Sequence, residues 1–464
     1  MSEESRLISR REFLKGSLAG AACLGLGGLA LQAHADRPPN FIVILCDDLG
    51  YQDVGCFGSP LISTPNADRM ATEGMRFTDF YAAAPVCTPT RAALMTGCYP
   101  VRVGLPSVIN YRSTVGINSE EITIAELLKT RGYATACIGK WHLGWQRQFL
   151  PTRHGFDCYY GIPYSNDMSY EDFPVPLMRN EEIIEQPAVQ ETLTERYTEE
   201  AVKFITKHKD EPFFLYLPHT FPHVPLHASD RFKGKSKRGL YGDVVECIDW
   251  STGQILDALK RLGLDGNTLV VFTSDNGPWT VKAEIGGCAL PLRSGKGTTW
   301  EGGMRVPCIM RWPGHIPAGT ACSETSSVMD FYPTLAKLTG AKVPADRIID
   351  GRNISPLMAG ENGAKSPHEA FFYYRAEELQ AVRSGGWKLV LPHRDRLTKQ
   401  DVPQALYDLH ADIGETTDVS GVYPSIGARL QAMIERCRED LGDAITGVPG
   451  KNRRPPGSAD KAGR

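Results

Sequence analysis

The chain has 464 residues, of which 42% are hydrophobic and 23% are charged. That length predicts a large domain followed by a smaller one, in a globular protein of ordinary composition. The formal net charge of −3 excludes a broad positive field, so nucleic-acid binding is not expected and an anionic ligand would need local cations.

The N-terminus resembles a twin-arginine export signal. Residues 9–15, Ser-Arg-Arg-Glu-Phe-Leu-Lys, precede an apolar run over residues 16–31, and the small residues Ala33 and Ala35 suit cleavage by signal peptidase. We therefore expect residues 1–35 to be a signal peptide, recognised by the twin-arginine translocase and removed on export to the periplasm or the outside of the cell.

Two other roles for the N-terminus are disfavoured. The apolar run of about 16 residues is shorter than the roughly 20 that span a bilayer, so no stable membrane anchor is expected. A lipoprotein site at Cys23 is disfavoured because Gly20 stands where an aliphatic residue is expected. Eleven cysteines remain after cleavage, an odd number, so at least one is unpaired.

Alternating strands and helices are predicted for residues 36–365. The expected buried strands are residues 40–46, 133–138, 213–217 and 269–273. The expected helices are residues 118–131 with Asn118 as N-cap, 193–208 and 244–262. This order predicts an α/β fold with a mostly parallel central sheet, helices on both faces, and a ligand site beyond the carboxyl ends of the strands.

The C-terminal part has a different pattern. A Gly- and Pro-containing stretch at residues 360–367 predicts a boundary, followed by a small antiparallel α+β domain over residues 366–445. Its expected elements are short strands at 370–374, 380–383, 387–391 and 406–409 and a closing helix at 423–441. The tail, residues 446–464, is rich in Pro, Gly and basic residues and is expected to be disordered.

Ionisable or metal-binding side chains follow each of the four predicted strands. They are Asp47, Asp48, Lys140, His142, His219, His223, Asp275 and Asn276. Three clustered carboxylates need a cation between them, and oxygen ligands with one neutral amide suit Ca²⁺ better than Mg²⁺. The alternative is that Asp-Asp and Asp-Asn-Gly are ordinary turn residues.

Two further segments are candidates for chemistry. Cys87 stands where a polar loop gives way to a helix-like run, and helical N–H groups together with Arg91 would favour an anion there. Alternatively, Cys87 is a small buried residue or a disulfide partner of Cys98. Lys296 lies in a Gly-rich loop, residues 293–303, which could approach an oxyanion closely or simply lie at the surface.

Two long motifs resemble the signatures of the type I sulfatases. The run Cys87-Thr88-Pro89-Thr90-Arg91 followed by Thr96-Gly97 is similar to the first signature, and residues 132–144, Gly-Tyr-Ala-Thr-Ala-Cys-Ile-Gly-Lys-Trp-His-Leu-Gly, are similar to the second. The likeness extends from about residue 40 to about residue 409. It implies an alkaline-phosphatase-like fold and the arylsulfatase A and N-acetylgalactosamine-6-sulfatase branch, with a sulfated sugar or polysaccharide as substrate.

The resemblance also implies roles for individual residues. Cys87 would be oxidised to formylglycine (3-oxoalanine) by the formylglycine-generating enzyme before export. The implied Ca²⁺ ligands are Asp47, Asp48, Cys87, Asp275 and Asn276. The implied substrate-binding residues are Lys140, Ser165, His223 and Lys296. The implied catalytic residues are Cys87, Arg91, Lys140, His142, His223 and Lys296.

The expected mechanism follows from the charge that develops when a sulfate ester breaks. A divalent metal and the cations Arg91, Lys140 and Lys296 would stabilise that charge. One hydroxyl of the formylglycine hydrate would attack sulfur, His223 with Lys296 would protonate the leaving oxygen, and His142 would take the proton of the second hydroxyl. The alternatives are a phosphate or phosphonate monoesterase on the same fold and a non-catalytic protein that binds sulfated glycans.

Overall fold

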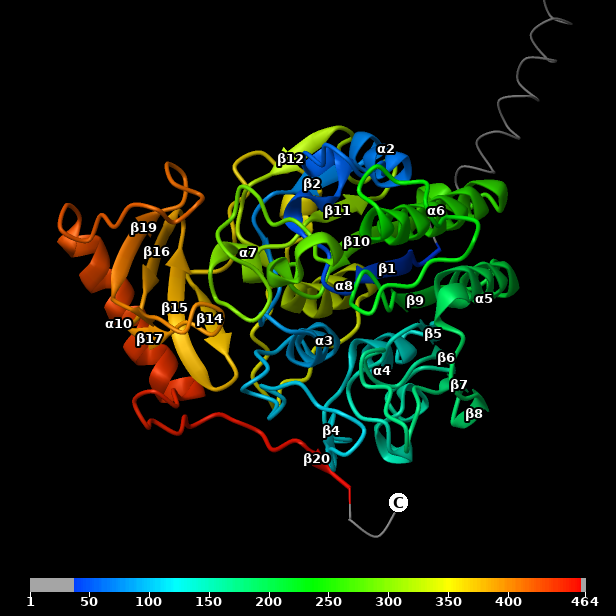
Figure 1. Cartoon of the computed structure of the whole chain (residues 1–464), viewed down its shortest axis with the longest axis horizontal. Coiled ribbons are helices and arrows are strands. Elements are labelled where there is room, and N and C mark those ends of the chain that lie inside the picture. Colours follow the sequence, from blue (N-terminus) through cyan, green and yellow to red (C-terminus); the bar gives the residue numbers. More distant parts are fainter. Residues whose placement is uncertain (1–36, 460–464) are drawn as a thin grey trace, which may run out of the picture.

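The structure is a computed structural model that describes residues 37–459, and the expected signal peptide lies outside the described residues (Figure 1). Its centre is a ten-stranded sheet with the strand order β12-β2-β11-β10-β1-β9-β5-β6-β7-β8. The bounds are β1 Asn40–Cys46, β2 Met75–Phe77, β5 Ala134–Ile138, β6 Cys158–Gly161, β7 Leu177–Arg179, β8 Glu182–Glu185, β9 Phe213–Pro218, β10 Thr268–Ser274, β11 Cys308–Arg311 and β12 Thr320–Cys322.

The four strands that the sequence predicts are neighbours in the middle of this sheet. β10, β1, β9 and β5 pair in parallel, and each is buried along its whole length. Their carboxyl ends therefore meet at one edge of the sheet, which brings the polar residues that follow them together.

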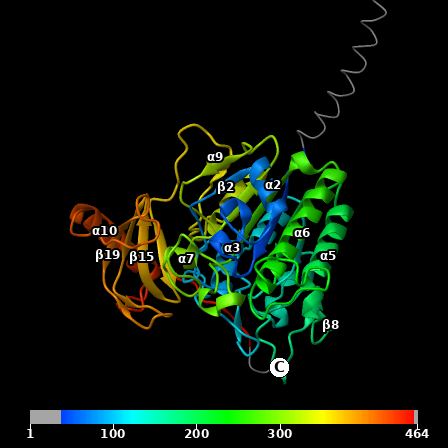
Figure 2. The same cartoon turned by 45° about the horizontal axis from the view of Figure 1, so that its top comes forward.

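Helices cover both faces of the sheet, as expected. Alternate residues of β1 point to opposite sides: Ile42 and Ile44 join the core that includes α2, α5 and α6, whereas Val43 and Leu45 join the core that includes α3, α4 and α8. Figure 2 shows α5 and α6 side by side. The helix bounds are α2 Pro65–Glu73, α3 Cys87–Thr96, α4 Ile124–Lys129, α5 Leu193–Lys207, α6 Leu240–Arg261, α7 Glu301–Met304, α8 Phe331–Thr339, α9 Ser355–Met358 and α10 Pro424–Leu441.

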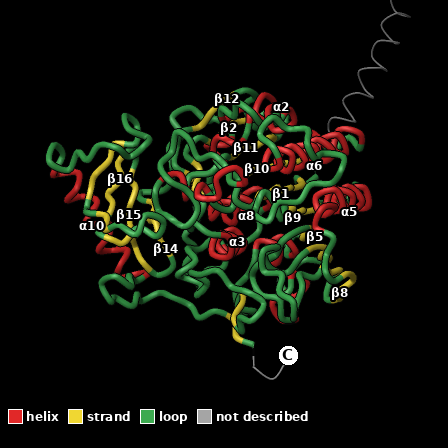
Figure 3. Tube along the Cα trace, viewed as in Figure 1, coloured by secondary structure: helices red, strands yellow, loops and turns green. Residues whose placement is uncertain are grey.

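The C-terminal part forms the expected antiparallel sheet with a closing helix (Figure 3). Its strand order is β14-β15-β16-β19, with bounds Phe371–Arg375, Glu378–Ser384, Trp387–Val390 and Ala405–Asp408. The α/β fold class with this second sheet is confirmed. Because one buried core includes residues of both parts, the domain boundary at residues 365 and 366 stays a prediction.

Three smaller strand pairs complete the fold. They comprise β3 Phe80–Tyr81 with β13 Ser326–Ser327, β17 His393–Arg394 with β18 Asp401–Val402, and β4 Val115–Gly116 with β20 Gly457–Ser458. Isolated bridges also join Tyr81 to Arg305 and Asp443 to Val448. Within residues 37–459, no helix has both the length and the apolar character that crossing a membrane requires.

For the helix predicted at residues 118–131, the predicted first residue is wrong. The observed helix α4 begins only at Ile124, because Thr123 rather than Asn118 is its N-cap. The Thr123 hydroxyl accepts from the Glu126 N–H at 3.2 Å, and the Glu126 carboxylate accepts from the Thr123 N–H at 2.7 Å. The Asn118 side chain instead accepts from the Glu120 N–H at 3.0 Å, which closes a turn.

The prediction of a disordered tail is wrong for residues up to 459. β20 pairs with β4, and Arg454 forms two contacts with the buried carboxylate of Glu121, at 2.6 and 3.0 Å. The tail has little apolar surface to bury, but Arg454 pairs with Glu121 and Arg453 pairs with Glu377 between β14 and β15, which composition alone does not indicate. Residues 460–464 lie outside the described residues.

Candidate active site

The parallel register of β1 and β10 brings the predicted metal ligands together. Cys46 and Ser274 are partners at the ends of these strands, so Asp47 and Asp48 follow beside Asp275 and Asn276. The Asp48 N–H donates to Asp275 Oδ1 at 3.2 Å, and Asn276 Nδ2 donates to Asp48 Oδ1 at 2.7 Å. All four side chains are buried. Asp48 has a φ of +67°, a conformation that costs free energy in a residue other than glycine and that is common at functional sites.

The chemistry of this cluster fits a divalent cation. Asp47 Oδ1 and Asn276 Oδ1 are buried and have no hydrogen-bond partner within residues 37–459, although buried oxygens usually have one. Burial and the negative charge of Asp47 raise the pKa of Asp275 to about 7, the direction expected for a carboxylate that shares a buried site with a second carboxylate. Ligand atoms of Asp47, Asp48 and His223 lie within 4.8 Å of one another, so His223 is placed where it could add a nitrogen ligand to the oxygen atoms of the cluster.

Three cations lie against the carboxylates. Arg91 donates two hydrogen bonds to Asp275 Oδ2, at 3.0 and 2.7 Å, and Lys140 Nζ contacts Asp47 Oδ2. Lys296 Nζ lies 2.7 Å from Asp48 Oδ2. Three carboxylates and three cations balance, so a bound divalent ion would leave the site with a charge of about +2, which would attract an anionic substrate.

The same cations act on the protonation of the cluster. Burial would raise the pKa of Asp47, but Lys140, together with Arg91 and Lys296, outweighs burial and holds the pKa well below its usual range. Burial would lower the pKa of Lys296, but Asp48 raises it above its ordinary value. Asp47 is therefore a carboxylate and Lys296 an ammonium at neutral pH.

Cys87 is the first residue of α3 and lies against a pocket of about 540 Å³. Four predicted site residues line this pocket: Cys87, Ser165, His223 and Lys296. Burial raises the pKa of the Cys87 thiol although Lys140 and Lys296 oppose the shift. The unmodified side chain is therefore a neutral thiol, because loss of hydration outweighs the nearby cations, although Lys140 and Lys296 act in the direction that favours an anion at this position. Cys87 and Cys98 are both free, so the alternative of a disulfide between them is excluded.

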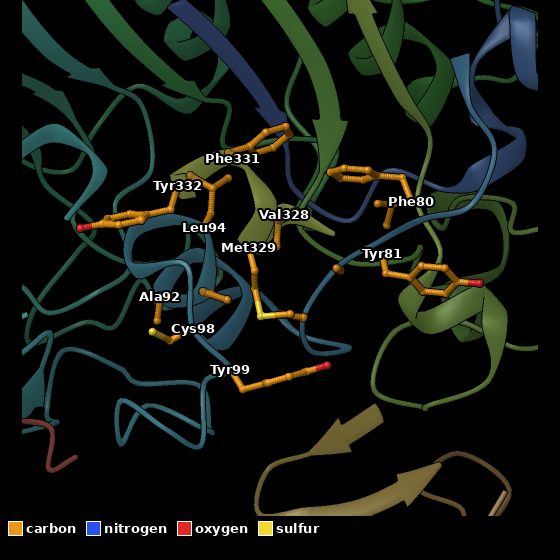
Figure 4. Close-up of a cluster of buried hydrophobic side chains, with 14 of the residues drawn as sticks. Phe80, Tyr81, Ala92, Leu94, Cys98, Tyr99, Val328, Met329, Phe331 and Tyr332 are labelled. Carbon is orange, nitrogen blue, oxygen red and sulfur yellow. The ribbon is translucent and has the colours of Figure 1, made fainter. Parts of the chain in front are cut away.

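The helix that carries Cys87 is held by apolar packing on its far side. Figure 4 shows Leu94 of α3 among Met329, Phe331 and Tyr332, with Tyr99 nearby, and all of these side chains are buried. This packing fixes the N-terminus of α3, and with it position 87, relative to the sheet.

His142 has one free nitrogen. Its Nε2 lies 2.8 Å from the carbonyl oxygen of Ile109; because a carbonyl only accepts, Nε2 carries the proton. Its Nδ1 is buried and has no hydrogen-bond partner in the described part of the chain. Burial, together with Lys140 and Arg91, lowers the pKa of His142 well below its usual value. The ring is neutral, and its Nδ1 lone pair is free to accept a proton. His142 is not among the side chains that line the pocket.

His223 is oriented in a comparable way. Its Nδ1 lies 2.6 Å from the carbonyl oxygen of Val224 and must donate to it, so Nε2 faces Asp48 Oδ2 at 3.7 Å. Burial and Lys296 lower the pKa of His223. The neighbouring His219 is fully buried and does not line the pocket.

Several pocket residues were not predicted from the sequence. Trp279 packs between His223, with ring centres 5.9 Å apart, and the Lys296 ammonium, 4.7 Å from the ring centre. Its place just after the Asp-Asn-Gly turn at the end of β10 is the one signal that could have found it. Arg396 and Lys399 also line the pocket, but they come from the C-terminal part of the chain, and no local motif marks them.

Comparison with known proteins assigns the chain to a family. Residues 39–341 match the family model described as sulfatase. The chain belongs to the sulfatase family. Residues 295–440 of this sulfatase also match the model described as N-sulphoglucosamine sulphohydrolase, C-terminal. The resemblance of the two signatures is thus confirmed, and with it the alkaline-phosphatase-like fold: the protein is an enzyme that hydrolyses sulfate esters.

Relatives and solved structures agree with this assignment. The sulfatase is 39% identical to arylsulfatase A from Homo sapiens, over 91% of this chain and 92% of the relative. It is 42% identical to N-acetylgalactosamine-6-sulfatase from Rattus norvegicus, over 77% of this chain and 72% of the relative. The crystal structure of Ps i-CgsB in complex with k-i-k-neocarrahexaose has a TM-score of 0.77 and 34% identity, and the match covers 89% of this chain and 97% of that chain.

The export prediction is also confirmed. Residues 7–27 match the model for a twin-arginine translocation signal. The sulfatase therefore leaves the cytoplasm by this route, for the periplasm or the outside of the cell.

Proposed function

We propose that this sulfatase removes sulfate from sulfated sugars or polysaccharides, with formylglycine at position 87 and Ca²⁺ as cofactors. The observation that carries the proposal is the pocket in which Cys87, Ser165, His223 and Lys296 meet beside the buried acidic cluster. The sugar substrate is supported by the names of two similar proteins, one an N-acetylgalactosamine-6-sulfatase and one solved with a neocarrahexaose.

The residues present fit both cofactors. Asp47, Asp48, Asp275 and Asn276 would hold Ca²⁺, since they offer oxygen atoms of which two lack a partner among the described residues. The ion would supply positive charge against the sulfuryl oxygens. A hydrated formylglycine at position 87 would supply the nucleophilic hydroxyl that a neutral, buried thiol does not.

The cations of the site would bind and orient the sulfate. Lys296 lines the pocket directly, and Lys140 donates to the pocket residue Ser165 at 3.0 Å. Both side chains are nine-tenths or more buried and each contacts a carboxylate of the cluster, so their interaction with negative charge that develops on the substrate is strong. Arg91 would act indirectly, because its two hydrogen bonds hold the Asp275 carboxylate in place.

The two histidines would move protons in opposite directions. His223 would give a proton from Nε2 to the leaving oxygen. Because its Nδ1 faces a carbonyl, that proton is present only on the charged ring, which the negative charge of a bound sulfate ester favours. His142, neutral with a free Nδ1, would accept the proton whose removal regenerates the aldehyde.

The test compares hydrolysis of 4-nitrophenyl sulfate and 4-nitrophenyl phosphate by the exported protein. We expect clear preference for the sulfate, and loss of turnover in Cys87→Ala with nearly unchanged thermal unfolding. Preference for the phosphate would instead support a phosphate or phosphonate monoesterase. Binding of a sulfated sugar without sulfate release, by a protein whose Cys87 is unmodified, would support a non-catalytic glycan-binding protein.

A further inference from the structure

We propose that Arg396 and Lys399 form a second anion site at the rim of the pocket, which recognises a further sulfate or carboxylate group on the alcohol that carries the scissile ester. This inference rests on the proposed function and deepens it, because it names the class of substrate: an alcohol with two anionic groups rather than one. The site would determine specificity and take no part in bond cleavage.

The two side chains belong to the loop between β17 and β18 and line the same pocket as Cys87 and Lys296. The Nη1 atom of Arg396 lies 3.5 Å from the place that a Cβ atom would take on Gly297. Gly297 has a φ of +85°, so glycine suits the backbone there and also leaves space beside the guanidinium. Arg396 therefore lies over the residue that follows Lys296, close to where the scissile sulfate is proposed to bind.

The loop that presents these cations is fixed by a buried carboxylate. Asp395 accepts from Trp300 Nε1 at 3.0 Å and from the N–H groups of Leu397 and Thr398, both at 2.8 Å. Trp300 immediately precedes α7, at the end of the Lys296 loop. The two loops are thus tied together, and the backbone that presents the two exposed cations would lose little conformational entropy when an anion binds.

Neither cation is neutralised within the described residues. Arg396 and Lys399 form no ion pair there, whereas Arg394 on the same hairpin pairs with Asp401 at 3.0 Å. Asp167 is the one carboxylate among the side chains that line the pocket. The carboxylate on their own loop, Asp395, accepts hydrogen bonds from Trp300, Leu397 and Thr398 instead of pairing with either cation. An anion at the rim would therefore find two charged donors that the described residues leave unpaired, and charged hydrogen bonds of this kind discriminate strongly.

The experiment compares two chromogenic esters that differ by one anionic group, 4-nitrophenyl sulfate and 2-carboxy-4-nitrophenyl sulfate. The measured quantity is the ratio of kcat/KM for the carboxylated ester to kcat/KM for the simple ester. We expect this ratio to fall about tenfold in Arg396→Ala and about threefold in Lys399→Ala, since loss of one charged hydrogen bond is worth roughly a tenfold change. Arg394→Ala is the matched control: it removes a cation of the same hairpin outside the pocket and should keep the wild-type ratio.

Three outcomes would overturn the inference. An unchanged ratio in both variants would mean that the rim does not bind the second anion. An equal loss of kcat/KM for both esters would mean that Arg396 contacts the scissile sulfate itself. A matching fall of the ratio in Arg394→Ala would mean a general charge effect. If the wild-type protein releases sulfate from neither ester, the proposed function fails as well, so failure of the rim site alone is recognisable by intact hydrolysis of 4-nitrophenyl sulfate.

Discussion

Replacing Lys296 by Met should reduce kcat/KM for 4-nitrophenyl sulfate by a factor of about 10²–10³. The Lys296 ammonium lines the pocket and is about nine-tenths buried. At a separation near 4 Å and an effective dielectric constant near 20, two unit charges interact by about 4 kcal/mol, and removal of one such donor from other enzymes costs a rate factor of about 10²–10³. Asp48, which loses its partner, keeps the hydrogen bond from Asn276, so folding should persist.

The matched control is Lys388→Met, because Lys388 is also a buried lysine but does not line the pocket. Its Nζ lies 3.0 Å from Glu301 and 2.7 Å from Glu415. Breaking this buried network should lower the free energy of unfolding by about 3–5 kcal/mol, while the folded fraction retains most of its activity. Urea unfolding and initial rates, measured on both variants, separate the two effects. A Lys296→Met protein that retains kcat/KM within tenfold of wild type would refute the electrostatic role of Lys296.

Three further predictions concern the metal, the base and the tail. EDTA should lower both the activity and the melting temperature, because a ligand that binds the folded state stabilises it. Ca²⁺ should restore both quantities more fully than Mg²⁺. If EDTA changes neither quantity, the metal assignment is wrong. In the pH profile of kcat/KM, the fall in activity on the acidic side should lie below about pH 6.5, the ordinary pKa of histidine. The reason is that burial, Lys140 and Arg91 lower the pKa of His142 and keep it a base. A fall above that pH that disappears in His142→Gln would contradict this. Arg454→Ala should lower the free energy of unfolding in urea by about 1–3 kcal/mol, because it removes both hydrogen bonds to the buried Glu121 and leaves only Arg347, at 4.0 Å, as its ion-pair partner among the described residues. Arg436→Ala, which breaks an exposed pair with Glu369, should change it by less than about 1 kcal/mol; equal effects would argue against an ordered tail.

The central sheet and the acidic cluster were predictable because they depend on long apolar runs and on one topological rule. Residues that follow parallel strands meet at a single edge, so Asp47 and Asp275 could be placed together before their register was known. The same rule gave no information on which cation faces which carboxylate. That pairing depends on the length of each side chain and on the path of the loop between strand and helix. Neither produces a periodic pattern that could be recognised in the sequence.

The features that were missed depend on contacts between distant segments. Asn118 is a good N-cap by type, but Thr123 and Glu126 form a complete capping box and fix the start of α4 instead. The tail appeared unable to fold because it has few apolar residues, yet Arg454 finds a carboxylate more than 300 positions away. Arg396 reaches the pocket because Asp395 ties its loop to Trp300, and such tertiary hydrogen bonds leave no local pattern in the sequence.

The measurement that tests the account most directly is a mass spectrum of the tryptic peptide that begins at Phe77 and contains Cys87. The account predicts that, in the active exported protein, this peptide has lost the elements of H₂S and gained one oxygen, as conversion of the thiol to an aldehyde requires. An active enzyme whose peptide carries the unmodified Cys87 thiol would contradict the account, whatever metal the acidic cluster binds.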